Sequence, residues 1–304
     1  MSRFYRWGFK TTFRFVALSD KKMHKQNVQR DIETKEFDYF GDGKKDHLLN
    51  VYFPKKENNN HSLIIDIHGG GWVYGDKDLN GDFCKFFAEN GYTVVSPSYT
   101  LILYDDILNI LKELSAVFDF VYAHLEEFGT DPSKIHLFGD SAGGQLGLLY
   151  ESINQSEALW NIYGKVSHPV DFASLCFQNP APYLTRVIFI GKPQFMERGA
   201  RKTFFEMYCG KSEKKDDINK VCSLENYIDE IKHLPPVFIT TSIGDVLLKP
   251  QSDSLAEDLS SRGFDVSIYV HQDENFGHVL NVTLPDCEGG RIVNSKILEF
   301  LSAF

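Results

Sequence analysis

The segment 139–144, which reads Gly-Asp-Ser-Ala-Gly-Gly, constrains the fold of this chain more than any other segment. It directly follows the apolar run 135–138, and an apolar run that ends in glycine predicts a buried strand followed by a turn. The small residues leave room for a sharp turn into a helix, with the hydroxyl of Ser141 at its corner. The segment therefore predicts a strand-turn-helix unit of an α/β fold.

A serine hydroxyl is a weak nucleophile, and it becomes reactive when a tight turn exposes it beside a base. Residues 139–143 fit the G-x-S-x-G pattern of a nucleophile elbow. A five-residue pattern also arises by chance, and two alternatives remain. The segment could be an ordinary glycine-rich turn, or a phosphate site at the N-terminus of a helix.

A second glycine-rich segment, His68-Gly69-Gly70-Gly71, follows the apolar run 63–67. Three consecutive glycines lose much backbone freedom on folding, so their presence indicates a specific need. Their N–H groups can point into a cavity, as an oxyanion hole for acyl transfer requires. We predict Gly70 and Gly71 as donors, and the N–H of Ala142 would complete the hole. A flexible linker is the alternative.

Together these two motifs resemble those of α/β-hydrolases, and in particular those of esterases related to hormone-sensitive lipase. The resemblance extends from about residue 36 to the C-terminus. It implies a mostly parallel central sheet with helices on both faces and a cap, or lid, inserted in the chain. It also implies that His68 and Gly69 support the oxyanion loop without taking part in proton transfer.

This fold places an acid and then a histidine after the nucleophile, each on a loop that follows a late strand. Asp245 comes just after the strand-like run 236–241, and His278 follows the alternating run 266–270. We therefore predict Ser141, Asp245 and His278 as a catalytic triad. The order along the chain leaves alternatives for the acid and the base. The alternative acids are Asp253, Asp258, Asp273 and Glu274, and the alternative base is His271.

The triad predicts a serine hydrolase that cleaves carboxylic esters through an acyl-enzyme. We expect small, neutral, short-acyl substrates. Formamidase or amidase activity, or carbohydrate acetyl or feruloyl esterase activity, would use the same triad. A non-catalytic binding protein of the same fold is an alternative from another class. Two departures from the family pattern leave the branch open: the block 98–104 replaces the usual D-Y-R-L-A-P-E, and Lys249 stands where a second acid is common.

Composition limits the partners and the location. With 42 acidic and 32 basic residues, the net charge of −10 disfavours binding to nucleic acid or to an anionic membrane. The sequence shows no apolar stretch long enough to cross a bilayer and no signal-peptide core, so stable membrane insertion is not expected. The five cysteines are scattered and read as reduced thiols of a cytoplasmic protein. No motif calls for a metal or an organic cofactor, and a homo-oligomer is compatible with the sequence.

We divide the chain into an N-terminal segment, 1–35, and a catalytic domain, 36–304, with a cap insertion at about 180–234. The first thirty residues are basic and aromatic, so they could lie on a membrane surface. We favour the interpretation that this segment is part of the cap. The aromatic residues of the insertion would wall an acyl pocket or form the cap's own core. The charged run 211–220 is predicted to be a solvated loop.

Overall fold

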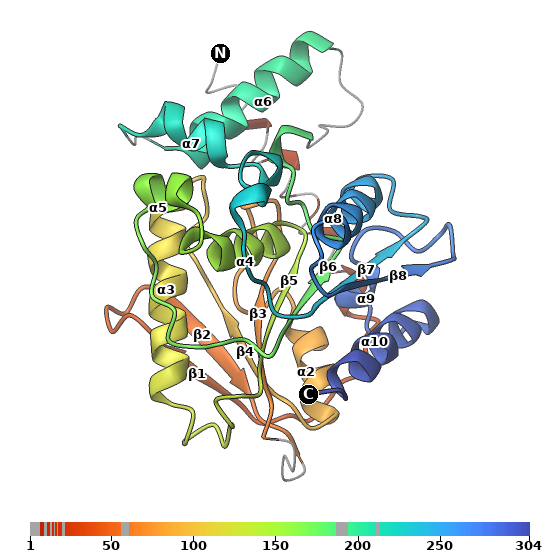
Figure 1. Ribbon diagram of the computed structural model, residues 1–304. Coiled ribbons are helices and arrows are strands. Elements are labelled where there is room, and N and C mark those ends of the chain that lie inside the picture. Colours follow the sequence, from red (N-terminus) through yellow and green to blue (C-terminus); the bar gives the residue numbers. More distant parts are fainter. Residues whose placement is uncertain are drawn as a thin grey trace.

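The computed structural model describes residues 7, 8, 11, 12, 14, 16, 18, 19, 22–55, 61–186, 194–210 and 213–304. Within them, eight strands form one sheet in the order β1-β2-β4-β3-β5-β6-β7-β8 (Figure 1). β2 runs antiparallel to β1 and β4, and all neighbours from β4 through β8 are parallel. The strands are β1 Thr34–Asp38, β2 Leu48–Tyr52, β3 Leu63–Ile67, β4 Thr93–Pro97, β5 Ile135–Asp140, β6 Ser174–Gln178, β7 Val237–Ser242 and β8 Val266–His271.

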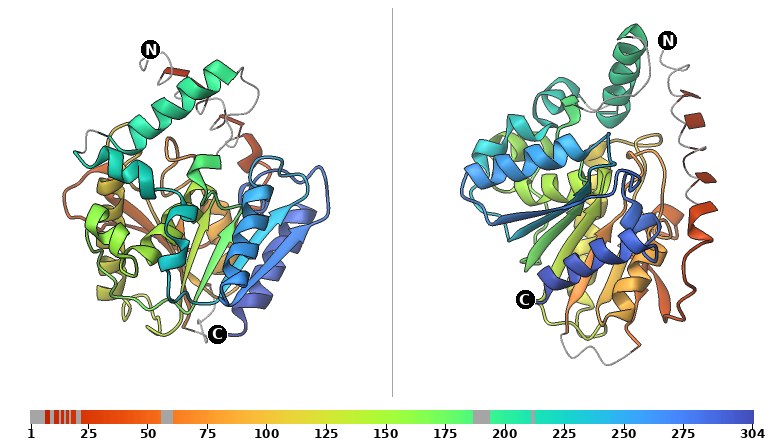
Figure 2. Two further views of the ribbon diagram at one scale, coloured as in Figure 1. Left: turned by 45° about the horizontal axis from the view of Figure 1, so that its top comes forward. Right: turned by 90° about the vertical axis from the view of Figure 1, so that its right-hand side faces the viewer.

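Helices cover both faces of this sheet, as predicted (Figure 2). α3, α4 and α8 lie on one face, and α2 and α10 lie on the other. The helices are α2 Gly81–Glu89, α3 Ile107–Ala123, α4 Ala142–Ile153, α5 Glu157–Tyr163, α6 Gln194–Tyr208, α7 Lys215–Val221, α8 Lys249–Ser261, α9 Leu280–Thr283 and α10 Glu288–Leu301. Short 3-10 turns occur at η1 Lys45–His47, η2 Leu184–Arg186, η3 Leu224–Asn226 and η4 Ile228–Glu230.

The central strands are apolar along their whole length because both of their faces are covered. Every residue of β3 and β5 is buried. Side chains alternate between the two faces: Ile65 and Leu137 pack in the cluster that includes α3, whereas Ile64 and Phe138 pack in the cluster that includes α2. This layered core holds the carboxyl ends of the parallel strands at one edge of the sheet.

The segment between β6 and β7 carries most of the structure that lies beyond this edge. α6 and α7 lie above the edge at which α4 begins (Figure 1). The predicted solvated loop at 211–220 is wrong for its described part, because α7 forms there and buries Ile218 and Val221. These two apolar residues are three positions apart, so they lie on one face of the helix, and that face is buried. The division of the chain into a domain and a cap stays a prediction.

Most of the first 21 positions of the predicted N-terminal segment, 1–35, lie outside the described residues. Its later part packs beside α2 and the C-terminal helices. Asn27 Nδ2 donates to Asp82 Oδ2 at 2.8 Å and to Thr283 O at 2.9 Å, and Arg30 binds Asp286 through two hydrogen bonds. The chain is therefore tied to the α2 side of the sheet before β1 begins.

Among the helices of the described residues, none has both the length and the apolar character that crossing a bilayer requires.

Candidate active site

Ser141 lies at the junction of β5 and α4 in a conformation that few side chains adopt. Its φ is +50° and its ψ is −112°, so the backbone is strained there. The turn is fixed by hydrogen bonds from Ser141 N to Gln178 O at 2.9 Å and from Ala181 N to Ser141 O at 3.1 Å. Ser141 is partly exposed between buried neighbours. This geometry presents the hydroxyl at the carboxyl edge of the sheet.

The glycines of the elbow permit close contact between α4 and β3. A Cβ atom on Gly143 would lie only 1.9 Å from the carbonyl oxygen of Ile67, so no larger residue fits without a shift of the backbone. The requirement for a small residue at this position is therefore steric. It brings the start of α4 against the end of β3, where the glycine-rich loop begins.

The loop after β3 turns beside the elbow. Gly70 and Gly71 have φ values of +95° and +60°, and Gly70 O accepts hydrogen bonds from Val73 N at 3.1 Å and Tyr74 N at 3.2 Å. Gly69 N donates to Asp140 Oδ1 at 2.7 Å. Since Asp140 directly precedes Ser141, this bond fixes the loop against the nucleophile turn.

His68 is buried and packs parallel to Tyr99, with a ring-centroid distance of 4.3 Å. Its Nδ1 lies 2.9 Å from the carbonyl oxygen of Gly69, so the tautomer that fits donates from Nδ1. Burial lowers the pKa of His68 to about 4, and the ring is therefore neutral at pH 7. Tyr99 OH also donates to His68 O at 2.8 Å. These contacts agree with a supporting role for His68.

The structure brings Asp245 and His278 together. His278 Nδ1 lies 2.8 Å from Asp245 Oδ2. Asp245 Oδ1 accepts from Leu247 N at 3.0 Å and from Leu248 N at 3.1 Å. Burial alone would raise the pKa of Asp245, but its bond to His278 and these two N–H groups hold that pKa below its ordinary value. Asp245 is thus a charged acceptor for the histidine.

Asn179 is a contributor that the sequence analysis missed. Its Nδ2 donates to Asp245 Oδ2 at 2.6 Å and to Thr241 Oγ1 at 3.0 Å. Asn179 is buried, has a φ of +46°, and follows β6 directly. The available signal was a polar residue at the end of an apolar strand, placed between the elbow and the acid in the chain. Asn179 fixes the carboxylate that faces His278.

The alternative acids and the alternative base have other surroundings. Asp253 pairs with Lys249 at 2.5 Å, and Asp258 binds Arg262 and the hydroxyl of Tyr183. Asp273 Oδ1 accepts a hydrogen bond from Asn275 N at 2.8 Å, and Glu274 is exposed. His271 packs against Phe276, with ring centroids 4.6 Å apart. The contact to His278 therefore favours Asp245 among the five acids considered.

Burial raises the pKa of Asp140, the residue before Ser141, and a protonated His278 would lower it, so His278 is close enough to interact with the elbow. The side chain of His278 is 26% exposed. The next residue, Val279, has a φ of +46°, which is rare for a β-branched side chain and indicates a tightly held turn.

Behind the oxyanion loop lies a buried pair of carboxylates, which the sequence analysis did not predict. Asn80 Nδ2 donates to Asp66 Oδ2 at 2.9 Å and to Asp140 Oδ1 at 2.8 Å. Cys84 Sγ lies 3.7 Å from Asp66 Oδ2. Burial, and then the charge of Asp140, raises the pKa of Asp66 to about 7. A lone acid in the apolar run of β3 was the only sequence signal.

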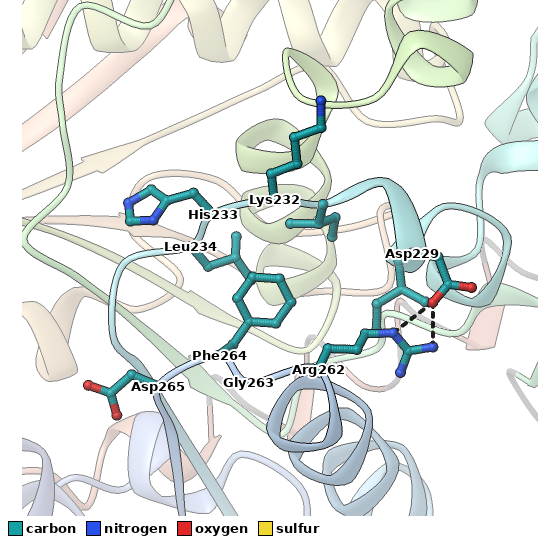
Figure 3. A pocket seen from close by; sticks show the side chains of 10 residues that line it. Asp229, Lys232, His233, Leu234, Arg262, Gly263, Phe264 and Asp265 are labelled. Carbon is teal, nitrogen blue, oxygen red and sulfur yellow. Dashed lines mark hydrogen bonds and ion pairs between the residues drawn. The ribbon is translucent and has the colours of Figure 1, made fainter.

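A pocket of about 420 Å³ lies away from this site (Figure 3). It is lined by residues that precede β7 and β8, among them Leu234, Asp265 and Arg262, which pairs with Asp229 at 2.7 Å. These positions lie at the amino ends of the strands, at the opposite edge from Asp245 and His278. In the described part of the chain, no three His, Cys, Asp or Glu side chains gather as a metal site.

A strained serine between β5 and α4, a glycine loop after β3 and an acid–histidine pair after β7 and β8 define an α/β-hydrolase. The chain belongs to the BD-FAE family, which matches residues 49–259. The predicted resemblance to esterases related to hormone-sensitive lipase is confirmed, and so is the predicted α/β-hydrolase fold with its mostly parallel sheet and helices on both faces; the cap insertion stays a prediction.

Named relatives agree with this assignment. Lipase 2 of Moraxella sp. (strain TA144) is 33% identical over 109 residues, which cover 35% of this chain and 25% of that protein. Carboxylesterase NlhH of Mycobacterium tuberculosis (strain ATCC 25618 / H37Rv) is 26% identical over 253 residues, which cover 79% of this chain and 75% of that protein. The match thus spans only a quarter of Lipase 2.

Among solved structures, esterase B from Lactobacillus rhamnosis (HN001) superposes with a TM-score of 0.88. The alignment covers 99% of this chain and 95% of that one at 22% identity. This likeness extends the shared fold to almost the whole chain.

Proposed function

We propose that this protein is a serine carboxylesterase that acts on small, neutral esters with short acyl groups. The observation that carries the proposal is the strained elbow of Ser141, with the glycine loop bonded to the residue beside it. A non-glycine residue at φ +50° needs support from its surroundings, and such strain is concentrated at functional sites. A structural turn at this point has no need for an exposed hydroxyl.

The proposed mechanism follows from the Asp245–His278 contact. Because Nδ1 of His278 faces Asp245, the neutral ring has its Nε2 free of that contact to accept the proton of Ser141. Ser141 Oγ then bonds to the ester carbonyl carbon, and the negative oxygen is stabilised by N–H groups of Gly70, Gly71 and Ala142. The alkoxide leaves with the proton from His278. Water, deprotonated by His278, then attacks the acyl carbon; the bond from this carbon to Ser141 Oγ breaks, His278 returns the proton to Ser141, and the acid leaves.

Several observations support a short-acyl, neutral substrate. Esterase B of Lactobacillus rhamnosis has been solved with a C4-C4 SN3 tributyrin phosphonate, and this chain shares its fold. Phe204 and Tyr208 of the proposed cap, about 180–234, pack against Trp72 beside the oxyanion loop. We propose that these aromatic rings form part of the wall of a short acyl pocket. The net charge of −10 disfavours anionic substrates.

Two further functions use the same residues. An amidase or formamidase, or an esterase for acetylated or feruloylated carbohydrates, would need only a different pocket. A non-catalytic binding protein would have no need for a hydrogen-bonded acid and histidine, and the Asp245–His278 pair therefore favours an enzyme.

We also propose a cytoplasmic location. All five cysteines are free, and Cys84, Cys176, Cys209 and Cys222 are buried. Free thiols are typical of a reducing compartment. The N-terminal segment as part of the cap, and assembly into a homo-oligomer, stay proposals as well.

Hydrolysis of p-nitrophenyl esters tests the proposal. We expect turnover of the acetate and butyrate, with a fall in kcat/KM for acyl chains beyond about four carbons, which is the result that a closed acyl pocket would give. Ser141→Ala should lower kcat by about 10⁴-fold or more. Ser152→Ala on the same helix is the matched control and should leave kcat unchanged. Faster turnover of N-formylkynurenine or of acetylated sugars would favour the other activities. Full activity in Ser141→Ala would refute the proposal.

A further inference from the structure

Trp72, the residue after the three glycines, is held in a conformation that a bulky side chain rarely adopts. Its φ is +61°, and it is only 3% exposed. A left-handed conformation persists at a non-glycine residue when its surroundings fix it. The contacts of the indole therefore decide how the oxyanion loop is held.

Those contacts come from two helices that are distant in the sequence. Trp72 Nε1 donates to Gln145 Oε1 at 3.0 Å, and Gln145 Nε2 donates to the hydroxyl of Tyr208 at 3.1 Å. Gln145 and Tyr208 are 1% and 0% exposed. The indole also packs edge-on against Phe204 and Tyr208, with ring centroids 5.3 and 6.1 Å away. A buried hydrogen-bonded chain thus joins the loop after β3 to α4 and α6.

These hydrogen bonds connect the two segments that carry the proposed oxyanion donors. The loop that ends at Trp72 carries Gly70 and Gly71, and α4 carries Ala142 at its first position. Gln145 lies one turn further along α4, and its backbone N–H bonds to the carbonyl oxygen of Ser141 at 3.3 Å. The bond between Trp72 and Gln145 therefore fixes the distance between the two segments that donate to the oxyanion.

We propose that Tyr208, acting through Gln145, is a positioning residue for the oxyanion hole. Docking of α6 orients the amide of Gln145, the amide orients Trp72, and Trp72 sets the loop that carries Gly70 and Gly71. The inference rests on the proposed esterase function and deepens it. Misplacing catalytic groups by about 1 Å lowers rates by about 10²-fold, so weakening these hydrogen bonds in part lowers kcat measurably.

Tyr208→Phe removes only the hydroxyl that bonds to Gln145 and keeps the ring. For p-nitrophenyl butyrate we expect kcat to fall about tenfold with KM within about twofold, since a looser hole affects the transition state more than the bound ester. Affinity for a trifluoromethyl ketone, whose adduct with Ser141 carries an oxyanion, should fall by the same factor as kcat. Gln145→Met should lower kcat more than Tyr208→Phe does, and the double variant should have the same kcat as Gln145→Met alone.

Tyr150→Phe is the matched control. Tyr150 is on α4, is 0% exposed, and its hydroxyl lies 2.8 Å from Ser115 Oγ and donates to Ser167 O. Tyr150→Phe removes a buried tyrosine hydroxyl, as Tyr208→Phe does, so the free energy of unfolding in urea should fall by a similar amount in both variants. Tyr150→Phe should keep wild-type kcat and ketone affinity. Equal losses of kcat in the two variants would show that Tyr208 has only a structural role and would overturn the inference.

Hydrogen exchange separates this inference from the proposed function, because it needs no turnover. The amides of Gly70 and Gly71 should exchange faster in Tyr208→Phe than in the wild type or in Tyr150→Phe. If the wild type hydrolyses esters but Tyr208→Phe and Gln145→Met keep kcat and amide exchange within twofold, the inference fails and the esterase stands. If no ester is hydrolysed but exchange still responds to Tyr208→Phe, the esterase fails and the coupling stands.

Discussion

At the scale of single residues, Asp66 is a buried carboxyl group beside the site whose protonation depends on its surroundings. The amide of Asn80 joins it to Asp140, and the thiol of Cys84 lies near the same carboxylate oxygen, Oδ2, that this amide contacts. Burial and the charge of Asp140 raise its pKa to about 7. The folded protein thus holds a proton at Asp66 between about pH 4 and pH 7 that the unfolded chain has released. Stability from this group falls as pH rises through that window.

Asp66→Asn should remove this pH dependence, because the amide has a similar shape and does not titrate. The free energy of unfolding of the variant, relative to the wild type, should rise from pH 4 to pH 7 by up to about 1.4 kcal/mol per pH unit. Above pH 8 the difference should stay constant. Urea unfolding at pH 4, 5, 6, 7 and 8 measures it. A difference that does not change over this range would show that Asp66 is ionised throughout.

At the scale of elements, the loop after β3 depends on backbone that only glycine supplies easily. Gly70 has a φ of +95°, and a Cβ there would lie 2.0 Å from Tyr74 O. Gly91, in the turn after α2, has nearly the same φ of +96° but nothing within 4 Å of its Cβ position. The two glycines therefore separate the effect of backbone conformation from the effect of crowding.

We expect Gly91→Ala to lower the free energy of unfolding by about 1–2 kcal/mol, the strain of a left-handed alanine, with kcat unchanged. Gly70→Ala carries the same strain and also displaces the loop from Tyr74. It should lower kcat by about 10²-fold or more, as the loss of an oxyanion donor does. Urea unfolding and turnover of p-nitrophenyl butyrate test both. Similar kcat values for the two variants would show that Gly70 does not shape the hole.

At the scale of the whole molecule, the N-terminal segment is joined to the C-terminal part of the chain through Arg30. Its guanidinium donates to Asp286 at 2.5 and 3.0 Å and to Glu89 at 2.7 Å, and its side chain is 6% exposed. Burial would raise the pKa of Asp286, but Arg30 and the N–H of Val28 lower it below its ordinary value. This pair adds stability above about pH 4 and loses it as pH falls.

Arg30→Gln should lower the free energy of unfolding at pH 7 by about 2 kcal/mol, since hydrogen bonds between charged groups are broken in a nearly buried site. The difference should shrink below pH 4, where Asp286 becomes protonated. Arg262→Gln is the control, because Arg262 pairs with the exposed Asp229 (Figure 3) and such surface pairs contribute about 0–1 kcal/mol. Equal losses in the two variants would refute a special role for Arg30.

The sequence was informative where function depends on local pattern. The elbow of Ser141, the glycine loop and the strands that precede Asp245 and His278 all follow from short motifs and apolar runs, and the structure has each strand within a few residues of its predicted range. Asn179 and Tyr208 could not be predicted in the same way. Their contacts join segments more than 60 residues apart, and only the packed fold brings such side chains together.

The central claim is that Ser141 is a nucleophile activated by His278. A fluorophosphonate that reacts with activated serines tests it directly, with the labelled peptide identified by mass spectrometry. The account predicts one label per chain, on Ser141, and a labelling rate at least about 10³-fold lower in His278→Ala, because the base no longer accepts the proton. A label on another residue, or equal labelling rates in the wild type and His278→Ala, would contradict it.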